Sequence, residues 1–307
     1  MLKKRFFSIL TIALLICLIP LTGCSHNKNR RPVLRVTFLD VGQGDSIVIE
    51  SPTGKVIVVD GGGNPGTDER LGRDPGNYVV VPYLRSRGIS TVDLIVPTHP
   101  DEDHVQGLNA VVARLNVRAA LDGGYPAAPP AYQRLMTTLS RRHIPIHLAR
   151  RPNRIDIGGG AFLEVLAPGE TPIRGSHSAT NNNSIVLRVV YDKARFLLTG
   201  DAEAEEEEEI MATAPDIGSD VLKAGHHGSR WSTSDAFLFR VHPTLAIISC
   251  GKNNLYNHPH REMLQRLARN NVRILRTDQN GGVIIETDGA TIQVTPTIID
   301  PGKRGSD

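Results

Sequence analysis

Short runs of apolar, often β-branched residues alternate with polar, glycine-containing segments along most of the chain. Runs of this kind, bounded by turn residues, are typical of buried β-strands. The turn sequence Ser51-Pro52-Thr53-Gly54 predicts a hairpin between two of them. The pattern predicts strands at 34–39, 47–50, 55–59, 92–96, 119–122, 162–166, 185–191, 194–198, 221–223, 245–249, 273–276, 282–287 and 290–296.

Longer segments between these strands predict helices at 78–86, 108–115, 131–143, 202–213, 234–240 and 261–270. Helices that alternate with strands in this way indicate an α/β fold. No linker divides residues 33–298, so we expect one domain, followed by a polar tail at 299–307.

The helix expected at 202–213 begins with an acidic run, Glu203 and Glu205–Glu209. Acidic side chains stabilise the N-terminus of a helix. We therefore interpret this run as a solvated helix face and not as a metal-binding tract.

The first 24 residues form no part of this domain. Lys3, Lys4 and Arg5 precede the apolar stretch 6–21, which is shorter than a comfortable membrane span. Leu21-Thr22-Gly23-Cys24 then resembles the lipobox of bacterial lipoproteins. The resemblance implies a signal peptide at 1–24, lipidation of Cys24, a linker at 25–32 and a mature chain held at the membrane outside the cytoplasm. A plain amino-terminal anchor helix is the alternative.

The charge changes once this segment is set aside. The formal net charge of the whole chain is +3, from 35 basic and 32 acidic residues. Six basic residues lie within positions 1–31, which leaves 29 basic residues against 32 acidic ones. The net charge therefore gives no argument for nucleic-acid binding.

The most basic stretch of the domain is 147–154, with Arg150, Arg151 and Arg154. It is a candidate for phosphate contact, and a solvated loop is the alternative. Cysteine usage excludes an intrachain disulfide, because only Cys250 lies outside the amino-terminal segment. Cys250 follows a buried strand pattern, so we expect it in the core.

The strongest chemical signal is the stretch Thr98-His99-Pro100-Asp101-Glu102-Asp103-His104. It follows a predicted strand and precedes a predicted helix, which is where open α/β folds place their sites. Imidazole and carboxylate side chains together suit zinc, manganese or iron. The alternative is a surface loop in which an aspartate caps the helix.

Two later strands also end in residues that bind metals. Asp201 ends the strand at 194–198, and His226-His227 follow the strand at 221–223. Together with the first stretch they supply enough ligands for two divalent ions, including one carboxylate that can bridge them. Glycines 61–63 allow a close backbone approach, either to such a centre or in a tight turn. The ligand pattern favours hydrolysis of phosphate esters, amides or thioesters without choosing among them.

These motifs resemble the metallo-β-lactamase superfamily. The segment His99-x-Asp101-x-Asp103-His104 is similar to its His-x-His-x-Asp-His motif, with Asp101 in place of the second histidine. The segments at 40–46, 197–201 and 222–229 are similar to the hydrolase domain of ComEC-type DNA-uptake proteins and its free-standing relatives. The resemblance covers about residues 34 to 288 and implies a four-layer αββα sandwich with two divalent ions, zinc or manganese.

The resemblance also implies roles for single residues. His99 and Asp101 would hold the first ion, and Asp201 would bridge. The second ion would be held by Asp103, by His104 and by one histidine of the 226/227 pair.

Two further residues match positions near the family's site. Asp45 would orient the attacking water, and Asp103 would stand beside it in the catalytic machinery. His258 would lie on the substrate side; the alternative for His258 is a residue that merely starts a helix.

The sequence departs from the family pattern at two points. The superfamily's third-loop histidine is replaced by Asn181-Asn182-Asn183, which leaves the first site short of ligands; we do not expect His177 to substitute. ComEC proteins also carry a long polytopic membrane part, which this sequence lacks, so we do not expect DNA transport by this chain alone.

The leading hypothesis is a phosphodiesterase or nuclease acting on extracytoplasmic DNA, in contact with DNA-uptake machinery. A hydrolase of another ester or of a β-lactam is one alternative. A non-catalytic metal-binding lipoprotein that serves as a partner in an uptake complex is another.

Overall fold

The computed structural model describes residues 32–63, 74–126 and 129–298. The predicted signal peptide, Cys24, the linker up to residue 31 and the tail at 299–307 lie outside the described residues. Within the described residues, no helix has the length and apolar character needed to cross a membrane.

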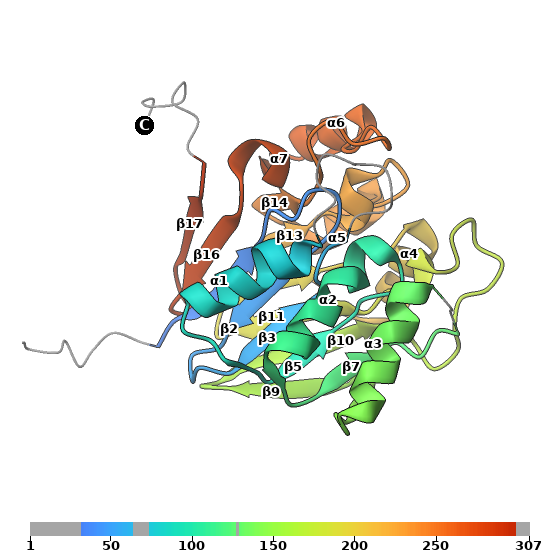
Figure 1. Ribbon diagram of the computed structural model, residues 1–307. Helices are drawn as coiled ribbons and strands as arrows, with labels where there is room; N and C mark the ends of the chain where they lie inside the picture. The colour runs from blue at the N-terminus through green and yellow to red at the C-terminus, as the bar shows by residue number, and fades with distance from the viewer. Residues whose placement is uncertain (1–31, 64–73, 127–128, 299–307) are drawn as a thin grey trace, which may run out of the picture. The chain divides into compact units, whose positions relative to one another are not determined.

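The first sheet contains eight strands of the described chain, in the order β17-β16-β1-β2-β3-β5-β7-β8. Its centre is antiparallel, whereas β3, β5, β7 and β8 run parallel (Figure 1). The strands are β1 (Leu34–Phe38), β2 (Ile47–Glu50), β3 (Val56–Val59), β5 (Leu94–Val96), β7 (Ala120–Asp122), β8 (Ile146–Leu148), β16 (Val283–Thr287) and β17 (Ile292–Pro296).

The second sheet contains seven described strands, in the order β15-β14-β13-β12-β11-β10-β9. Here β12 to β15 run parallel and β9 to β12 antiparallel. The strands are β9 (Arg154–Gly158), β10 (Ala161–Ala167), β11 (Val186–Tyr191), β12 (Ala194–Leu198), β13 (Val221–Lys223), β14 (Leu245–Ile248) and β15 (Arg273–Arg276).

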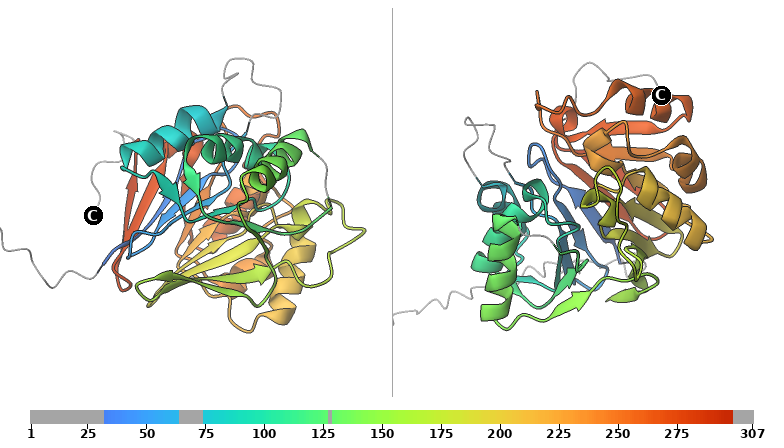
Figure 2. Two further views of the ribbon diagram at one scale, coloured as in Figure 1. Left: turned by 60° about the horizontal axis from the view of Figure 1, so that its bottom comes forward. Right: turned by 90° about the vertical axis from the view of Figure 1, so that its right-hand side faces the viewer.

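The two sheets pack face to face, and helices cover both outer faces (Figure 2). Apolar side chains from both sheets, such as Phe38 and Phe196, fill the space between them. Two further apolar clusters join each sheet to its own helices. The described helical segments are η1 (Gly76–Val80), α1 (Val81–Ser86), α2 (Glu102–Arg114), α3 (Pro130–Arg141), η2 (Asn181–Asn183), α4 (Ala204–Thr213), η3 (Gly225–Gly228), α5 (Asp235–Val241), α6 (Arg261–Arg269) and α7 (Thr277–Asn280). This arrangement is the expected αββα sandwich.

The strand expected at 92–96 is divided at Asp93. Its first part, β4 (Thr91–Val92), pairs with β6 (Asn116–Val117) in a separate two-stranded sheet. The Asp93 carboxylate accepts hydrogen bonds from Val56 N at 2.8 Å and from Arg118 at 2.5 Å. A hydrophobic pattern cannot reveal this break, because apolar residues flank Asp93 on both sides.

The basic stretch 147–154 is largely the loop that connects β8 to β9, and residues 152–154 are exposed. Its cations nevertheless contact the protein. Arg150 donates to Gly123 O at 2.7 Å, and Arg151 pairs with Glu209 at 2.9 Å. The Arg154 guanidinium lies 3.2 Å from the centre of the Phe162 ring. These contacts leave the stretch little charge for phosphates.

The acidic run of α4 is not a solvated face either. Glu203 is 3% exposed, and Glu206 and Glu207 are each 1% exposed. The Glu207 carboxylate accepts from the backbone N–H groups of Thr233 and Ser234, so it fixes the start of α5. The prediction was wrong because the run covers both faces of the helix, and one face packs against the sheet.

The parallel strands of both sheets bring their carboxyl ends to one edge of the sandwich. Asp60 follows β3 and His99 follows β5 in the first sheet. Asp201 follows β12, His226 follows β13, and Ser249 follows β14 in the second sheet. The fold therefore gathers the loops that the sequence singled out.

Candidate metal centre

One carboxylate oxygen, Asp201 Oδ2, lies at the centre of the gathered loops. Four imidazole Nε2 atoms of the described chain surround it, and the Asp201 side chain is itself buried. The distances to Asp201 Oδ2 are 3.9 Å from His99, 3.3 Å from His104, 3.8 Å from His226 and 3.3 Å from His227.

The other nitrogen of each imidazole is held by a separate group. The Nδ1–H of His104 donates to Asp60 Oδ2 at 2.8 Å. Thr98 donates its hydroxyl to the same Asp60 oxygen at 2.8 Å and accepts from His99 Nδ1 at 3.1 Å. Such partners fix the ring orientation of metal-binding histidines and leave Nε2 free to bind.

The histidine pair of η3 is held in the same way from the second sheet. His227 Nδ1 donates to the carbonyl oxygen of Ser249 at 3.0 Å. His226 Nδ1 donates to Glu203 Oε1 at 2.8 Å, and Asn181 Nδ2 lies 3.4 Å from the same nitrogen. All four Nε2 atoms therefore face Asp201 because their Nδ1 atoms are tethered outside the centre.

Glycines bring the start of α2 into this arrangement. A Cβ atom at Gly63 would lie 1.9 Å from Glu102 O, and one at Gly61 would lie 2.4 Å from Leu108 N. The glycines thus let a backbone segment pack against the helix that carries Asp103 and His104. Asp101 occupies the N-cap position of α2, but its side chain makes no capping hydrogen bond. The capping alternative therefore lacks its expected contact.

The loop with the histidine pair has an unusual backbone. His226 and His227 have φ values of 44° and 53°, in the left-handed region that non-glycine residues rarely adopt. Gly228 continues the turn at φ 86°, and a Cβ atom there would lie 2.5 Å from Pro259 Cβ. This close approach brings the His227 loop against the segment that carries His258, since the two rings have centroids 6.3 Å apart.

A buried lysine lies beside two carboxylates of the centre. Lys223 is fully buried and forms an ion pair with Asp45 Oδ2 at 2.5 Å. Its ammonium also donates to Gly200 O at 3.0 Å and lies 3.7 Å from Asp201 Oδ1. Asp45 Oδ1 lies 3.7 Å from His227 Nδ1. Lys223 thus ties Asp45 to the backbone beside Asp201.

Opposite charges dominate the electrostatics of the centre. Burial alone raises the pKa of Asp103 and Asp201, but the neighbouring histidines outweigh it and hold both pKa values below the usual range. Burial alone lowers the pKa of His227, yet Asp201 and Asp103 raise that pKa to about 9. A field that retains a proton on an imidazole also attracts a metal cation to the same nitrogen.

The donor set fits divalent cations. In the described structure, His99 Nε2, Asp45 Oδ1 and Asp201 Oδ1 are buried atoms without a hydrogen-bond partner. Buried polar atoms of this kind normally have partners. Ligand atoms of Asp45, His104, Asp201 and His227 all lie within 4.8 Å of one another. Imidazole nitrogens and carboxylate oxygens at this spacing can bind zinc or manganese.

The two sides of the centre differ. Asp103 Oδ2 lies 3.3 Å from His227 Nε2, and His104 Nε2 lies 3.3 Å from the same nitrogen, so these groups form a compact, buried set. On the other side, Asp101 Oδ2 lies 3.6 Å from His99 Nε2, and the Asp101 side chain is 43% exposed. The His99 side is therefore the more open one.

Of the two remaining histidines that the sequence singled out, one lies outside the cluster and the other lies beside it. His177 is exposed, and its ring stands 6.2 Å from Trp231 and outside the cluster, as we expected. His258 lies beside the histidine pair, with its ring centroid 5.3 Å from that of His226. It does not cap the following helix, since His260 occupies the N-cap position of α6.

Sequence analysis missed the residues that hold the histidines and the carboxylates: Thr98, Asp60, Glu203 and Lys223. A signal existed for some of them, because Asp60 and Lys223 each end or follow a strand beside a predicted ligand loop. A charged residue inside the apolar run at 221–223 is unusual for a core strand. No such signal marked Glu203 within its acidic run.

The sequence model of the metallo-beta-lactamase superfamily matches residues 39–252. Among curated proteins, the chain is 36% identical to ComE operon protein 3 of Bacillus subtilis, over 81% of this chain and 32% of that protein. It is 30% identical to Recombination protein 2 of Haemophilus influenzae, over 98% of this chain and 35% of that protein. The chain spans about a third of the length of these relatives.

Solved structures show the same fold at low sequence identity. Igni18, a metallo hydrolase from Ignicoccus hospitalis, aligns with a TM-score of 0.50 at 12% identity, over 82% of this chain and 98% of that one. The E377D mutant of CmlA beta-hydroxylase also aligns with a TM-score of 0.50 at 12% identity, over 83% of this chain and 54% of that one.

Proposed function

The chain belongs to the metallo-beta-lactamase superfamily, and from this premise we propose that it is a metal-dependent phosphodiesterase that cleaves DNA outside the cytoplasm. The observation that supports this proposal is the convergence of four tethered imidazoles on Asp201 Oδ2. The names of its relatives, which include Competence protein ComA of Neisseria gonorrhoeae at 30% identity over 81% of this chain and 31% of that protein, favour DNA as the substrate.

We assign the ligands by proximity. His99 and Asp101 would hold one cation, and Asp201 would bridge to the second. Asp103, His104 and His227 would complete the second site, with His227 preferred to His226 because it alone lies beside Asp103. Two such cations, when bound, lower the pKa of a water molecule and stabilise the attacking and leaving oxygens of a phosphodiester.

The chain's own residues prepare this chemistry. Asp60 holds the Nδ1 proton of His104, so that His104 presents a basic Nε2 to the centre. Lys223 pairs with Asp45 and fixes the position of its carboxylate, which can accept a proton from the attacking water. Burial and the neighbouring histidines lower the pKa of His258 to about 3. His258 therefore offers the substrate a neutral hydrogen-bonding group.

The openness of the His99 side supports a second candidate. Asn181 stands in the loop where the superfamily has a histidine and lies beside His226, so in the described structure the His99–Asp101 pair lacks an imidazole from that loop. A weakly held first ion would leave a non-catalytic metal-binding protein that serves as a partner in an uptake complex. Hydrolysis of another ester or of a β-lactam is the remaining alternative.

Turnover separates these candidates. The full-length chain, solubilised in detergent with manganese or zinc, is incubated with linear DNA, a chromogenic phosphodiester and a chromogenic β-lactam. We expect cleavage of DNA and of the diester, and loss of both in Asp103→Ala. Turnover of the lactam alone would replace the proposal, and no turnover of any substrate would favour the partner role.

We also propose that the chain is anchored by a lipid at Cys24 after cleavage of the preceding residues, on the basis of the sequence at 21–24. A Cys24→Ser variant should accumulate as unprocessed precursor or leave the membrane fraction. Migration and fractionation identical to those of the parent chain would contradict this anchor.

A further inference from the structure

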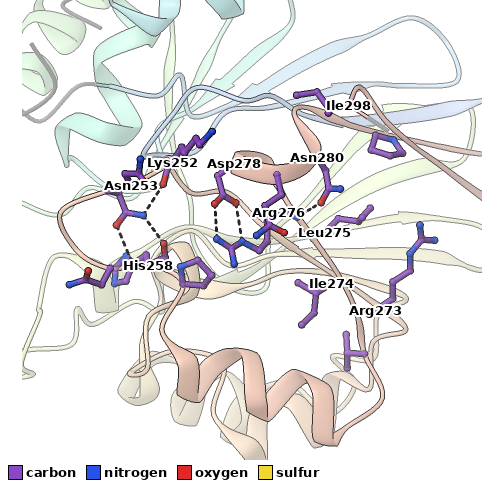
Figure 3. A pocket seen from close by; sticks show the side chains of 17 residues that line it. Lys252, Asn253, His258, Arg273, Ile274, Leu275, Arg276, Asp278, Asn280 and Ile298 are labelled. Atoms are coloured by element: carbon purple, nitrogen blue, oxygen red, sulfur yellow. Dashed lines mark hydrogen bonds and ion pairs between the residues drawn. The ribbon is translucent and has the colours of Figure 1, made fainter. Parts of the chain in front are cut away.

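A groove with a volume of about 1380 Å³ opens beside the metal centre (Figure 3). Its walls are the loop that follows β14, the strand β15, the short helix α7 and the end of β17. His258 lines one end of this groove, and the same ring lies 5.3 Å from that of His226. The groove therefore leads away from the candidate metal centre, and His258 is the one lining residue that the proposed function uses.

The groove is basic, although the described domain as a whole is not. Its walls carry Lys252, Arg273 and Arg276 against the single carboxylate of Asp278. Arg276 and Asp278 pair with each other at 2.6 Å and 2.9 Å. Among the described residues, neither the Lys252 ammonium nor the Arg273 guanidinium has a hydrogen-bond or ion-pair partner. Both cations are exposed and available to anions.

An exposed aromatic ring stands where the groove meets the centre. Tyr256 is 48% exposed, and its ring stacks on His258 with centroids 5.7 Å apart and planes 24° apart. Burial raises the pKa of Tyr256, and the charges of Asp103 and Asp101 raise it further. Tyr256 is thus an exposed ring that stands beside His258, at the end of the groove.

The loop that presents this ring is fixed by one side chain. Asn254 Oδ1 accepts from the backbone N–H groups of Tyr256 at 3.2 Å and His258 at 3.0 Å. Its amide donates to the carbonyl oxygens of Gly251 at 2.9 Å and His258 at 2.6 Å. The ring of Tyr256 is therefore held in place before any ligand arrives, which reduces the entropic cost of stacking on it.

We infer that this groove binds a single strand of nucleic acid on one side of the scissile phosphodiester, an inference that rests on the proposed function. Lys252 and Arg273 contact backbone phosphates, and Tyr256 stacks on the base next to the centre. Amides of Asn253, Asn257 and Gln279 along the walls can hydrogen-bond to base edges. An unpaired strand is required, because the faces of the bases in a duplex are already covered by their neighbours.

The first test measures binding without cleavage. All variants are made in an Asp103→Ala background of the full-length chain, and fluorescence anisotropy follows a labelled single-stranded oligonucleotide. Lys252→Gln with Arg273→Gln should weaken binding about tenfold or more and reduce the salt dependence by about two ions. The control Arg134→Gln with Arg141→Gln removes two exposed cations from α3 and should leave affinity unchanged.

The second test removes the ring. Tyr256→Ala should weaken binding about fivefold or more, since one stacked base contributes roughly 1–3 kcal/mol, whereas Tyr256→Phe should retain it. Phe239→Ala is the matched control, because Phe239 is an exposed ring on α5, 76% exposed and outside the groove.

Three outcomes would overturn the inference: equal affinity of the parent and the groove variants, equal affinity of Tyr256→Ala and the parent, or a blunt duplex that binds as tightly as the single strand. Failure of the proposed function is read separately, from the absence of diester turnover in the chain with Asp103 intact. Groove-dependent binding without turnover would retain the groove and reject the phosphodiesterase.

Discussion

Two groups of buried carboxylates in this domain have pKa values shifted in opposite directions. In the metal centre, Asp103 and Asp201 have pKa values below the usual range although burial opposes this. In α4, burial dominates instead: it raises the pKa of Glu207 to about 7, and it raises the pKa of Glu206 together with the charge of Glu209. The surroundings therefore favour the ionised form of the first group and the protonated form of the second.

The difference lies in the cations that the fold supplies. Imidazoles from two sheets surround Asp201, and Lys223 lies beside Asp45. Glu206 and Glu207 are buried, and the groups that lower the pKa of Glu207, the backbone N–H groups of Thr233 and Ser234, the Ser234 hydroxyl and Arg266, do not outweigh that burial. A run of acidic residues therefore does not identify a metal site; buried carboxylates bind cations where neighbouring groups keep them ionised.

The largest effect is expected from removing the lysine that pairs with Asp45 beside the metal centre. Lys223→Met leaves Asp45 buried without its partner, and the free energy of unfolding should fall by about 3–5 kcal/mol. Chemical denaturation measures the change. Lys193→Met, at an exposed lysine, is the control and should stay within about 0.5 kcal/mol of the parent. A comparable loss in both variants would show that the buried pair of Lys223 and Asp45 adds nothing particular to stability.

Removing a charge from the centre comes next. Asp103→Asn keeps the shape of the side chain but weakens metal binding, and turnover of a phosphodiester should fall by more than about 100-fold, or about 2.7 kcal/mol. Metal content of the purified chain gives a second readout. Glu208→Gln, at an exposed position on α4, should leave both unchanged. Full activity of Asp103→Asn would contradict the ionised-centre account.

The raised pKa of Glu207 should make the stability of the domain depend on pH. The folded-state pKa of Glu207, about 7, lies above its ordinary value of 4.5, so its contribution is fully present below pH 4.5 and is lost as pH rises through 7. A shift of this size corresponds to a loss of about 3 kcal/mol. The Glu207→Gln variant should lack this fall in stability between pH 4.5 and 7. At low pH the variant should be less stable than the parent, because the amide replaces one of the two oxygens that accept from backbone N–H groups. An unchanged profile would show that Glu207 is ionised in the folded state.

The smallest effect is expected on the affinity of the centre for the first metal ion, on its more open side. Asn181→His adds an imidazole in the loop where the superfamily has a histidine, and affinity for the first ion should rise about tenfold, or about 1.4 kcal/mol. Metal titration by calorimetry measures it. Asn183→His is not a suitable control, because the Asn183 amide fixes the loop through Ile173 and Ala179. Thr171→His, exposed on the same loop, serves better.

The sequence predicted the sandwich well because its strands are short apolar runs separated by turn residues, and periodicity reports burial. The strand over 194–198 matches β12 residue for residue, and 221–223 matches β13. The prediction of strands failed where a polar residue interrupts an apolar run, as at Asp93, and where a strand is exposed, as in β8. Neither feature leaves a hydrophobic pattern.

The candidate ligands were visible because metal-binding residue types cluster at strand ends, and the structure brings the loops of His99, Asp201 and His227 together. Their metal-binding role stays a prediction. The groups that orient them could not be predicted, since Ser249 acts through its carbonyl oxygen and Glu203 through a single rotamer. Which histidine of the pair faces Asp103 likewise depends on two left-handed residues that no propensity favours.

The position of β1 in the first sheet has a consequence for how the chain folds during its synthesis. Leu34 pairs with Thr287, so β1 is synthesised early but can pair with β16 only when nearly the whole domain has been made. Until residue 283 is available, β1 presents an unpaired edge that could pair with another chain. Pairing over such a separation is slow in two-state folding. Any chain truncated before β16 should therefore aggregate, and the complete domain should fold only after its synthesis is nearly finished.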